Sequence, residues 1–294
     1  MLISEYKQQR RCAKLAVIDT FKTRPETLQH GPSDQLTLRP AKFSREPTRH
    51  LMYHIWPHSR SDNWRWNITQ LRQRMHLFDG TRSIGVVTDP DTATLADVQA
   101  EFCDTRIDNW FESANQPLIG EPGNVMSDDG ACALLGEGLT FIPLLHTLPR
   151  DENDVTFYGH ARGARYAPGD GHFERHRRWS NMLYRGNLDD WPRVLTALTN
   201  QPMAGLFKRY EDFDLKRNWH WHYSGTFFWF RNADVFRSPD WPRLFPAMYG
   251  QVEAWPANMF RADEVACLFG DGAQHLYQEH ELAKWEDEFK RLRT

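Results

Sequence analysis

The stretch Trp219–Asn232, WHWHYSGTFFWFRN, brings together side chains that could bind a polar ligand. His222, Tyr223 and Ser224 follow one another and are closed by Gly225. A glycine beside a strand marks a place where a ligand or another backbone comes close. Aromatic core packing does not account for these polar residues arriving together. The first half of the stretch is therefore predicted to form one wall of a binding site.

The second half of the stretch, Phe227–Phe230, has the pattern of a buried strand. Successive strand side chains point to opposite faces, so Phe227 and Trp229 are expected on one face and Phe228 and Phe230 on the other. Rings on both faces indicate a central strand that is covered on both sides. Core packing explains these rings. Trp229 is nevertheless kept among the sugar-binding candidates, because a sugar ring stacks well on an indole face.

A second group of candidates follows the apolar run that ends in YGHARG, at Tyr158–Gly163. Glycine lets the backbone approach a ligand, and arginine pairs bidentately with phosphate oxygens. The cationic candidates here and in the ERHRRW segment that follows are His160, Arg162, Arg165, Arg177 and Arg178. The four arginines could converge on one anion, or the basic helix face could simply be solvated.

The acidic residues offer two further candidate sites. In TDPD, which begins at Thr88, the carboxylates of Asp89 and Asp91 could hold a divalent metal ion that bridges a diphosphate. The same residues also make a good turn, in which Asp91 caps the next helix. In RADEVACLF, Asp263 and Glu264 are expected to open a helix. They could stabilise the helix dipole there, or one of them could be a general base for a sugar hydroxyl.

The elements that must position these residues alternate between strands and helices. Apolar runs and two-residue periodicity predict strands within 50–57, 82–91, 106–115, 154–163 and 203–213. Helical spacing and capping residues predict helices within 61–78, 94–102, 139–148, 173–188, 189–199, 261–269 and 280–294, and a glycine-rich loop within 120–138. This order predicts a single α/β domain with a mostly parallel central sheet flanked by helices.

In an open α/β sheet the ligand binds outside the carboxyl ends of the strands. The predicted strand ends deliver His54, Thr88, Asp89, Asp91, His160, Arg162 and Arg165 to that edge. The WHWHYSGTFFWFRN stretch adds His222, Tyr223 and Ser224. The polar candidates therefore gather where this fold class binds its ligands.

Composition excludes several other classes of protein. The 294 residues are 40% hydrophobic with a formal net charge of −3, which argues against disorder and against a dedicated nucleic-acid binder. Four separated cysteines make neither a zinc site nor a disulfide framework. No apolar run approaches the ~20 residues of a membrane span. We expect a soluble cytoplasmic protein, with contact to a membrane surface left open. An N-terminal arm at 1–47 would precede a domain at 48–294, and the sequence predicts no oligomeric state.

Taken together, HYSGTFFWFR, FYGHARG, the early YHIWP and the downstream acidic pair resemble glycosyltransferases of the GT-A type, over about residues 48–285. The nearest resemblance is to a bacterial group of glycosyltransferase-like proteins. It implies a nucleotide-sugar donor and a saccharide or other hydroxyl acceptor. It also implies a sugar pocket lined by His222, Ser224 and Gly225. Asp263 or Glu264 would then be the catalytic base.

One departure from the family pattern concerns the metal. YGHARG stands where such enzymes carry an Asp-x-Asp motif for Mn²⁺ or Mg²⁺. A metal-independent reaction, in which cationic side chains neutralise the leaving diphosphate, is the alternative. The implied donor-binding residues are His54, Thr88, Asp89, Asp91, His160, Arg162, Arg165 and Arg178. A catalytically inactive nucleotide- or carbohydrate-binding protein of the same fold is the second functional hypothesis.

Overall fold

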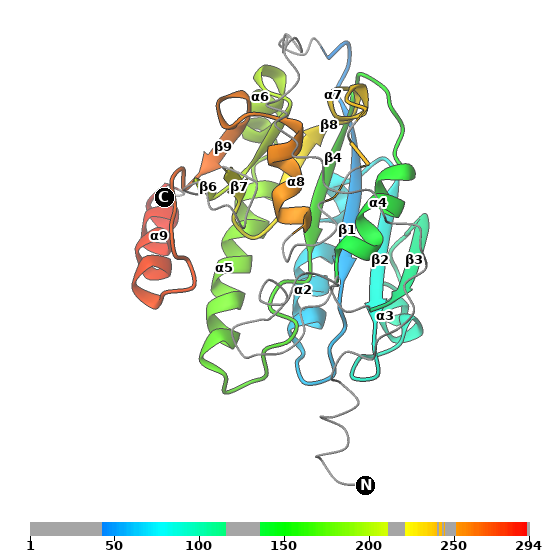
Figure 1. Ribbon diagram of the computed structural model, residues 1–294, viewed down its shortest axis with the longest axis vertical. Helices are drawn as coiled ribbons and strands as arrows, with labels where there is room; N and C mark the ends of the chain where they lie inside the picture. Colours follow the sequence, from blue (N-terminus) through cyan, green and yellow to red (C-terminus); the bar gives the residue numbers. More distant parts are fainter. Residues whose placement is uncertain are drawn as a thin grey trace, which may run out of the picture. The chain divides into compact units, whose positions relative to one another are not determined.

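A mostly parallel sheet runs through the computed structural model (Figure 1), which describes residues 43–115, 136–210, 221–239, 241–242, 244 and 251–292. In order across the sheet, its strands are β3 (Asn109–Ala114), β2 (Arg82–Thr88), β1 (Thr48–Ile55), β4 (Asp154–His160), β8 (Phe228–Arg231), β5 (Met203–Leu206) and β9 (Ala266–Phe269). The first four are mutually parallel, β8 is antiparallel to both of its neighbours, and β5 and β9 are parallel. The predicted α/β class is confirmed.

Helices cover both faces of this sheet. One core cluster packs strand residues such as Tyr53 and Phe157 against α2 (Asn63–Arg72), α3 (Leu95–Ala100), α5 (Gly171–Leu188), α6 (Trp191–Asn200) and α9 (Glu279–Arg291). The other packs Met52 and Tyr158 against α4 (Gly138–His146), α7 (Asn232–Arg237) and α8 (Gln251–Met259). A small antiparallel pair, β6 (Lys208–Tyr210) and β7 (Trp221–Tyr223), lies outside the main sheet. Among the described residues, no helix is long and apolar enough to cross a membrane.

The aromatic strand behaves as its alternation predicts. Phe227 and Trp229 belong to the first core cluster, whereas Phe228 and Phe230 belong to the second. The strand β8 lies between β4 and β5, so it is central and covered on both faces. Each successive ring therefore stabilises a different layer of the molecule.

Side chains cap the amino ends of α6 and α3. The Asp190 side chain accepts a hydrogen bond from the backbone amide of Arg193 and begins α6, as predicted. Thr94 and Asp97 form a reciprocal capping box at the start of α3. The helices predicted within 61–78, 139–148, 173–188 and 280–294 are confirmed as α2, α4, α5 and α9, with α2 followed by a short 3₁₀ turn, η2 (Met75–Leu77).

Two predicted elements are wrong. The segment 261–269 is not a helix: a 3₁₀ turn, η3 (Ala262–Glu264), leads directly into strand β9. Pairing of β9 with β5 at the sheet edge outweighs the acidic start that suggested a helix. The segment 203–213 is not one strand, because Phe207 takes a positive φ of 53° and separates β5 from β6.

Part of the predicted organisation lies outside the described residues. This applies to the arm through residue 42, to most of the loop predicted at 120–138, and to residues 211–220 before β7. The described residues all fall within the unit Leu36–Thr294. Of the cysteines in this part, Cys103 and Cys267 are free thiols.

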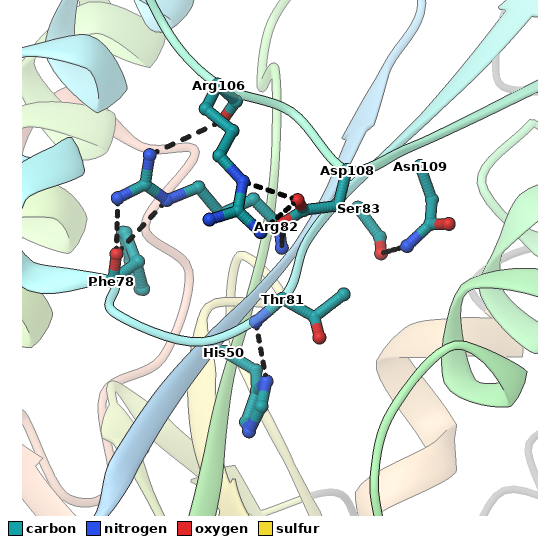
Figure 2. A network of polar contacts seen from close by, with 8 residues as sticks. All are labelled: His50, Phe78, Thr81, Arg82, Ser83, Arg106, Asp108 and Asn109. Atoms are coloured by element: carbon teal, nitrogen blue, oxygen red, sulfur yellow. Dashed lines mark hydrogen bonds and ion pairs between the residues drawn. The ribbon is translucent and has the colours of Figure 1, made fainter.

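A polar network fastens the amino ends of the strands (Figure 2). The His50 Nδ1 atom accepts a hydrogen bond from the Thr81 amide at 2.8 Å, and the Asp108 carboxylate accepts one from the Arg82 amide at 3.0 Å. Asn109 on β3 donates to the Ser83 hydroxyl on β2. These contacts fix the register of the edge opposite to the carboxyl ends, where the polar candidates gather.

The sheet reverses its direction of growth at β1. The chain adds β2 and β3 on one side of β1 and β4 on the other, so β1 and β4 flank a topological switch point. Ligands of open α/β sheets bind in the crevice at such a point, beyond the carboxyl ends of the strands. His54 and His160 are register partners at these two ends.

Candidate functional site

The first component of the site is a carboxylate–histidine pair at the carboxyl end of β4. The Glu137 Oε2 atom lies 3.3 Å from the His160 Nδ1 atom. On the other side of the ring, the His160 Nε2 atom is 3.1 Å from the carbonyl oxygen of Gly225. Because a carbonyl oxygen only accepts, Nε2 carries the hydrogen in this bond. The Nδ1 atom is therefore the nitrogen that exchanges a proton with Glu137.

The surroundings of the pair favour its neutral forms. The pKa of Glu137 is raised to about 7. Burial is the largest cause and the charge of Glu253 acts with it, while a hydrogen bond from Tyr158 and the charge of Arg162 act against the rise. Burial also holds the pKa of His160 well below its usual value. Glu137 consequently changes its charge near neutral pH beside a neutral imidazole. Groups with such a pKa are suited to general acid–base chemistry.

The Tyr158 hydroxyl supports the Glu137–His160 pair, and both side chains of the pair remain partly exposed. The Tyr158 hydroxyl donates to Glu137 Oε2 at 2.9 Å from the same face of β4. The side chains of Glu137 and His160 each keep 18% of their surface exposed. The carboxylate is therefore partly open to solvent while these residues hold it.

The helix α4 reaches this edge because of a glycine. A Cβ atom on Gly85 of β2 would lie 2.5 Å from the Cβ and Oγ1 atoms of Thr140, so only glycine permits this approach. The Thr140 Oγ1 atom in turn lies 2.8 Å from His54 Nδ1. Burial lowers the pKa of His54 to about 3, so His54 is neutral and serves as a structural partner. Glu137 immediately precedes α4 and is carried into place by this docking.

The turn between β7 and β8 closes the site from the other side. Gly225 has a φ of 103° and Thr226 a φ of 58°, which is a strained conformation for a β-branched residue. The turn is held by hydrogen bonds from the Thr226 amide to the Tyr223 carbonyl and from the Ser224 amide to the Phe207 carbonyl. The Gly225 carbonyl is thereby fixed toward His160. Backbone strain of this kind concentrates at functional sites.

A second acid lies beneath this turn. The Glu253 Oε1 atom on α8 lies 3.5 Å from both the His222 Nε2 atom and the Gly225 amide nitrogen. Its negative charge contributes to the raised pKa of Glu137. The predicted wall residues His222 and Gly225 are therefore linked to the pair through this carboxylate.

An arginine provides the positive charge of the site. Arg162 is 8% exposed, and its guanidinium carbon lies 3.7 Å from the centre of the Trp179 ring. Its Nη2 atom lies 3.4 Å from the Tyr277 hydroxyl. The charge of Arg162 acts on both Glu137 and His160. A cation thus adjoins the group that would handle a proton.

Several predicted candidates therefore come together. His54 and His160 lie side by side on β1 and β4, Gly225 accepts from His160, and Arg162 acts on the Glu137–His160 pair. Ser224 is buried in the same turn and is held by its backbone amide. The roles that the sequence assigned to these residues in binding a sugar or a donor stay predictions.

The acidic TDPD segment forms a turn. The Asp89 carboxylate accepts from the Trp56 indole N–H at 2.9 Å and from the Asp91 amide at 2.9 Å, which matches the predicted turn chemistry. Thr94, and not Asp91, caps the next helix. The Thr88 hydroxyl donates to Glu112 on β3. Within the described part of the chain, no group of three or more His, Cys, Asp or Glu side chains is arranged to hold a metal ion.

Three of the predicted arginines have partners elsewhere. Arg178 forms ion pairs with Glu279 and Glu286 of α9. Arg177 forms one with Asp62 at 2.8 Å. Both lie on α5, where their partners hold them, so the predicted convergence of four arginines on one anion is not observed. The exposed Arg165 donates to the Tyr166 hydroxyl.

The remaining candidates occupy other surroundings than predicted. Trp229 is 1% exposed in the core, where its indole N–H donates to the Asn187 carbonyl, so it presents no face to a sugar. Tyr223 is buried too, and its hydroxyl donates to the Ala266 carbonyl. Asp263 forms an exposed ion pair with Arg261, and Glu264 accepts from the Arg261 amide. These contacts match the structural explanation of the acidic pair, although in a 3₁₀ turn and not in a helix.

The sequence interpretation missed the carboxylate on which the site depends. Glu137 lies between two glycines in a segment that reads as a loop, and Glu253 lies in a helix with no distinctive motif. The only local signal was an acid placed directly before the apolar helix that begins at Gly138. Its contact with His160 depends on how α4 packs across the sheet.

Comparison with known proteins adds no relative. No protein-family model matches the sequence, and no curated protein matches it. The geometry of the chain's own residues therefore carries the functional argument.

Proposed function

We propose that the protein transfers a glycosyl group from a nucleotide-sugar donor to a hydroxyl acceptor such as a saccharide. Three features support this proposal. The sheet is mostly parallel, and its switch point carries the Glu137–His160 pair. Arg162 adds a positive charge beside the pair. The sequence motifs resemble those of GT-A type glycosyltransferases.

In the proposed reaction, Glu137 in its carboxylate form accepts the proton of the acceptor hydroxyl. The acceptor oxygen forms a bond to the anomeric carbon of the donor sugar, and the bond from that carbon to the diphosphate oxygen breaks. The diphosphate leaves with the electron pair, and the charge of Arg162 stabilises it. The Tyr158 hydroxyl donates to the carboxylate and orients it. Once Glu137 is protonated, it can donate to the His160 Nδ1 atom, which the bond from Nε2 to the Gly225 carbonyl keeps in place.

The observation that carries the proposal is the contact of the partly exposed Glu137 carboxylate with His160 at the switch point, and its pKa of about 7 fits the role. A base whose pKa lies near the working pH combines a useful ionised fraction with sufficient basicity. The alternative base at Asp263 or Glu264 stays a prediction. Glu137 is favoured over it because Asp263 and Glu264 are bonded to Arg261 in an exposed turn.

The test is a turnover assay of the full chain. Uridine, guanosine, cytidine and adenosine diphosphate sugars are incubated with a panel of saccharides, with either Mn²⁺ or EDTA present, and glycosylated product is measured. Glu137→Gln removes the base while keeping the side-chain size, and we expect it to slow transfer by about 10²–10⁴-fold. Glu152→Gln replaces an exposed carboxylate before β4 and is expected to leave the rate unchanged.

Three outcomes would count against the proposal. Equal rates for the wild type and Glu137→Gln would remove Glu137 as the base. Binding of nucleotide sugars without any turnover would favour the inactive binding protein, the hypothesis that the missing Asp-x-Asp motif supports. Turnover that needs Mn²⁺ would restore the predicted metal and argue against neutralisation of the diphosphate by Arg162.

A further inference from the structure

Arg162 is a buried cation for which the described residues provide no acidic partner. Within the part of the chain that the structure describes, no carboxylate forms an ion pair with it and its Nε atom has no hydrogen-bond partner. Among the described residues, the one hydrogen bond of its side chain, to the Tyr277 hydroxyl, is 3.4 Å long. Arg231 is a useful contrast, because it is equally buried but forms an ion pair with Asp234. A buried charge is costly unless it is paired.

Neighbouring side chains on α5 share this deficit. The indole N–H of Trp179, which is 1% exposed, has no hydrogen-bond partner among the described residues. The same is true of both ring nitrogens of His176, which is 5% exposed. Buried donors of this kind are normally satisfied, so each of them calls for an explanation. The three side chains belong to one stack: Arg162 covers the Trp179 ring, and the rings of His176 and Trp179 lie 6.0 Å apart at an angle of 12°.

The electrostatic field of this cluster is positive. Burial, followed by the charge of Arg162, lowers the pKa of His176 to about 2, and Arg165 and Arg175 act in the same direction. The His176 ring is therefore neutral and carries one N–H donor. Guanidinium, indole and imidazole N–H groups together offer several donors and one full positive charge. A phosphoryl group matches this combination, because it needs several donors and carries negative charge.

The cluster adjoins the Glu137–His160 pair and has access to solvent. A Cβ atom on Gly225 would lie 3.6 Å from the Trp179 Nε1 atom, and the Gly225 carbonyl accepts from His160. Tyr277 lies against Trp179, with ring centres 5.2 Å apart, and is 46% exposed. A ligand that enters beside Tyr277 would meet Arg162 first and the pair next.

We propose that Arg162, His176 and Trp179 bind a phosphoryl group of the substrate directly, without a metal ion. Arg162 would pair with two phosphoryl oxygens, and the indole and imidazole N–H groups would donate to the others. This inference rests on the proposed function only for the molecule that carries the group: the diphosphate of the donor or a phosphorylated acceptor. The binding itself needs no turnover.

Isothermal titration of the full chain in EDTA tests the proposal. The probes are pyrophosphate, nucleoside diphosphates and sugar 1-phosphates, with glucuronate as an anionic sugar that carries a carboxylate and no phosphoryl group. We expect at least one phosphoryl probe to bind, and we expect Arg162→Gln to weaken that binding at least tenfold. His176→Phe and Trp179→Phe remove the N–H donors while keeping an aromatic ring at each position, although Trp179→Phe also makes the side chain smaller. Each is expected to weaken binding several-fold. Arg237→Gln, a half-exposed arginine on α7, is the matched control and should bind as the wild type does.

Thermal unfolding of the same variants guards against misfolding. Because Arg162→Gln removes an unpaired buried charge, we expect its melting temperature to equal or exceed that of the free wild type. The phosphoryl probe should raise the melting temperatures of the wild type and of Arg237→Gln by the same amount, and that of Arg162→Gln by much less. Binding of nucleoside diphosphates with similar dependence on all three residues would assign the group to the donor, and preference for a sugar phosphate would assign it to the acceptor.

Several results would overturn the proposal. These are no phosphoryl binding in EDTA, equal binding by the wild type and Arg162→Gln, and binding of glucuronate alone. The two proposals fail separately. Transfer without Arg162-dependent phosphoryl binding would leave the proposed function standing, whereas phosphoryl binding without any transfer would leave this site standing.

Discussion

In the Glu137–His160 pair the carboxyl group holds its proton more tightly than the imidazole does, which is the reverse of their order in water. A carboxylic acid normally gives its proton to an imidazole, but burial penalises the ion pair that would result. The carboxyl group therefore keeps a pKa of about 7, and the imidazole stays neutral. Because ionising Glu137 inside the fold costs free energy, its carboxylate is more basic than a carboxylate in water, as the proposed role requires.

That cost predicts a pH-dependent effect of Glu137→Gln on stability. The pKa of Glu137 rises from 4.5 in the unfolded chain to about 7 in the folded one. The folded state therefore binds more protons between these values, and the stabilisation is complete below pH 4.5 and lost as the pH rises through 7. The difference in free energy of unfolding between Glu137→Gln and the wild type should therefore shift by about 2–3 kcal/mol in favour of the variant when the pH is raised from 5 to 8.

Urea unfolding at pH 5, 6.5 and 8 measures this difference. Glu152→Gln, at an exposed position, serves as the control and should differ from the wild type by the same amount at every pH. A difference between Glu137→Gln and the wild type that does not change with pH would mean that Glu137 ionises in the fold as it does in water.

At the scale of elements, the site depends on how closely α4 approaches β2. Gly85 leaves room for Thr140, and Thr140 bonds to His54 while α4 brings Glu137 to the sheet edge. The contact between a strand glycine and a helix threonine therefore sets the position of the base. This makes Gly85 a residue that supports the site without touching a substrate.

Gly85→Ala should consequently damage both stability and activity. The added Cβ would lie 2.5 Å from Thr140, so α4 must shift away from the sheet. We expect a loss of about 1–3 kcal/mol in free energy of unfolding, measured by urea titration, together with slower transfer. Gly171→Ala is the matched control, because its nearest contact would be the Arg175 side chain at 3.6 Å. Equal stabilities of the two variants would show that the added methyl group fits between β2 and α4 without cost.

Most elements could be predicted from the sequence because local patterns and tertiary packing agree. The apolar run of β1, the alternation of β8 and the Asp190 cap of α6 all act locally. The failures came where distant contacts decide. The β9 strand forms because it pairs with β5. Phenylalanine rarely adopts a positive φ, so the sequence gives no sign that Phe207 does.

The site was only partly predictable for the same reason. The strand-end rule located His54, His160 and Arg162, since each follows or ends a strand that the sequence reveals. It could not find Glu137 or the unpaired donors of α5, because their significance depends on burial and on the absence of partners. The WHWHYSGTFFWFRN stretch contacts the Glu137–His160 pair through a backbone group, the Gly225 carbonyl. Its side chains, which suggested the site in the sequence, contribute less directly.

At the scale of the whole described unit, the site crosses the carboxyl edge of the sheet from one layer to the other. The Glu137–His160 pair lies on the face covered by α4 and α8, whereas Arg162 stacks on Trp179 of α5 on the opposite face. Gly225 contacts both groups at the edge between them. A donor phosphoryl group and an acceptor hydroxyl could therefore reach the switch point from opposite layers.

The central claim is that Glu137 takes a proton from the acceptor during glycosyl transfer. The most direct measurement is the pH dependence of kcat/KM for transfer, between pH 5.5 and 8.5, by the wild type and by Glu137→Gln. The account predicts that the wild-type rate rises through a pKa near 7, as Glu137 loses its proton, and that Glu137→Gln gives a low rate without this rise. An identical rise in both proteins, or a wild-type rate independent of pH, would contradict it.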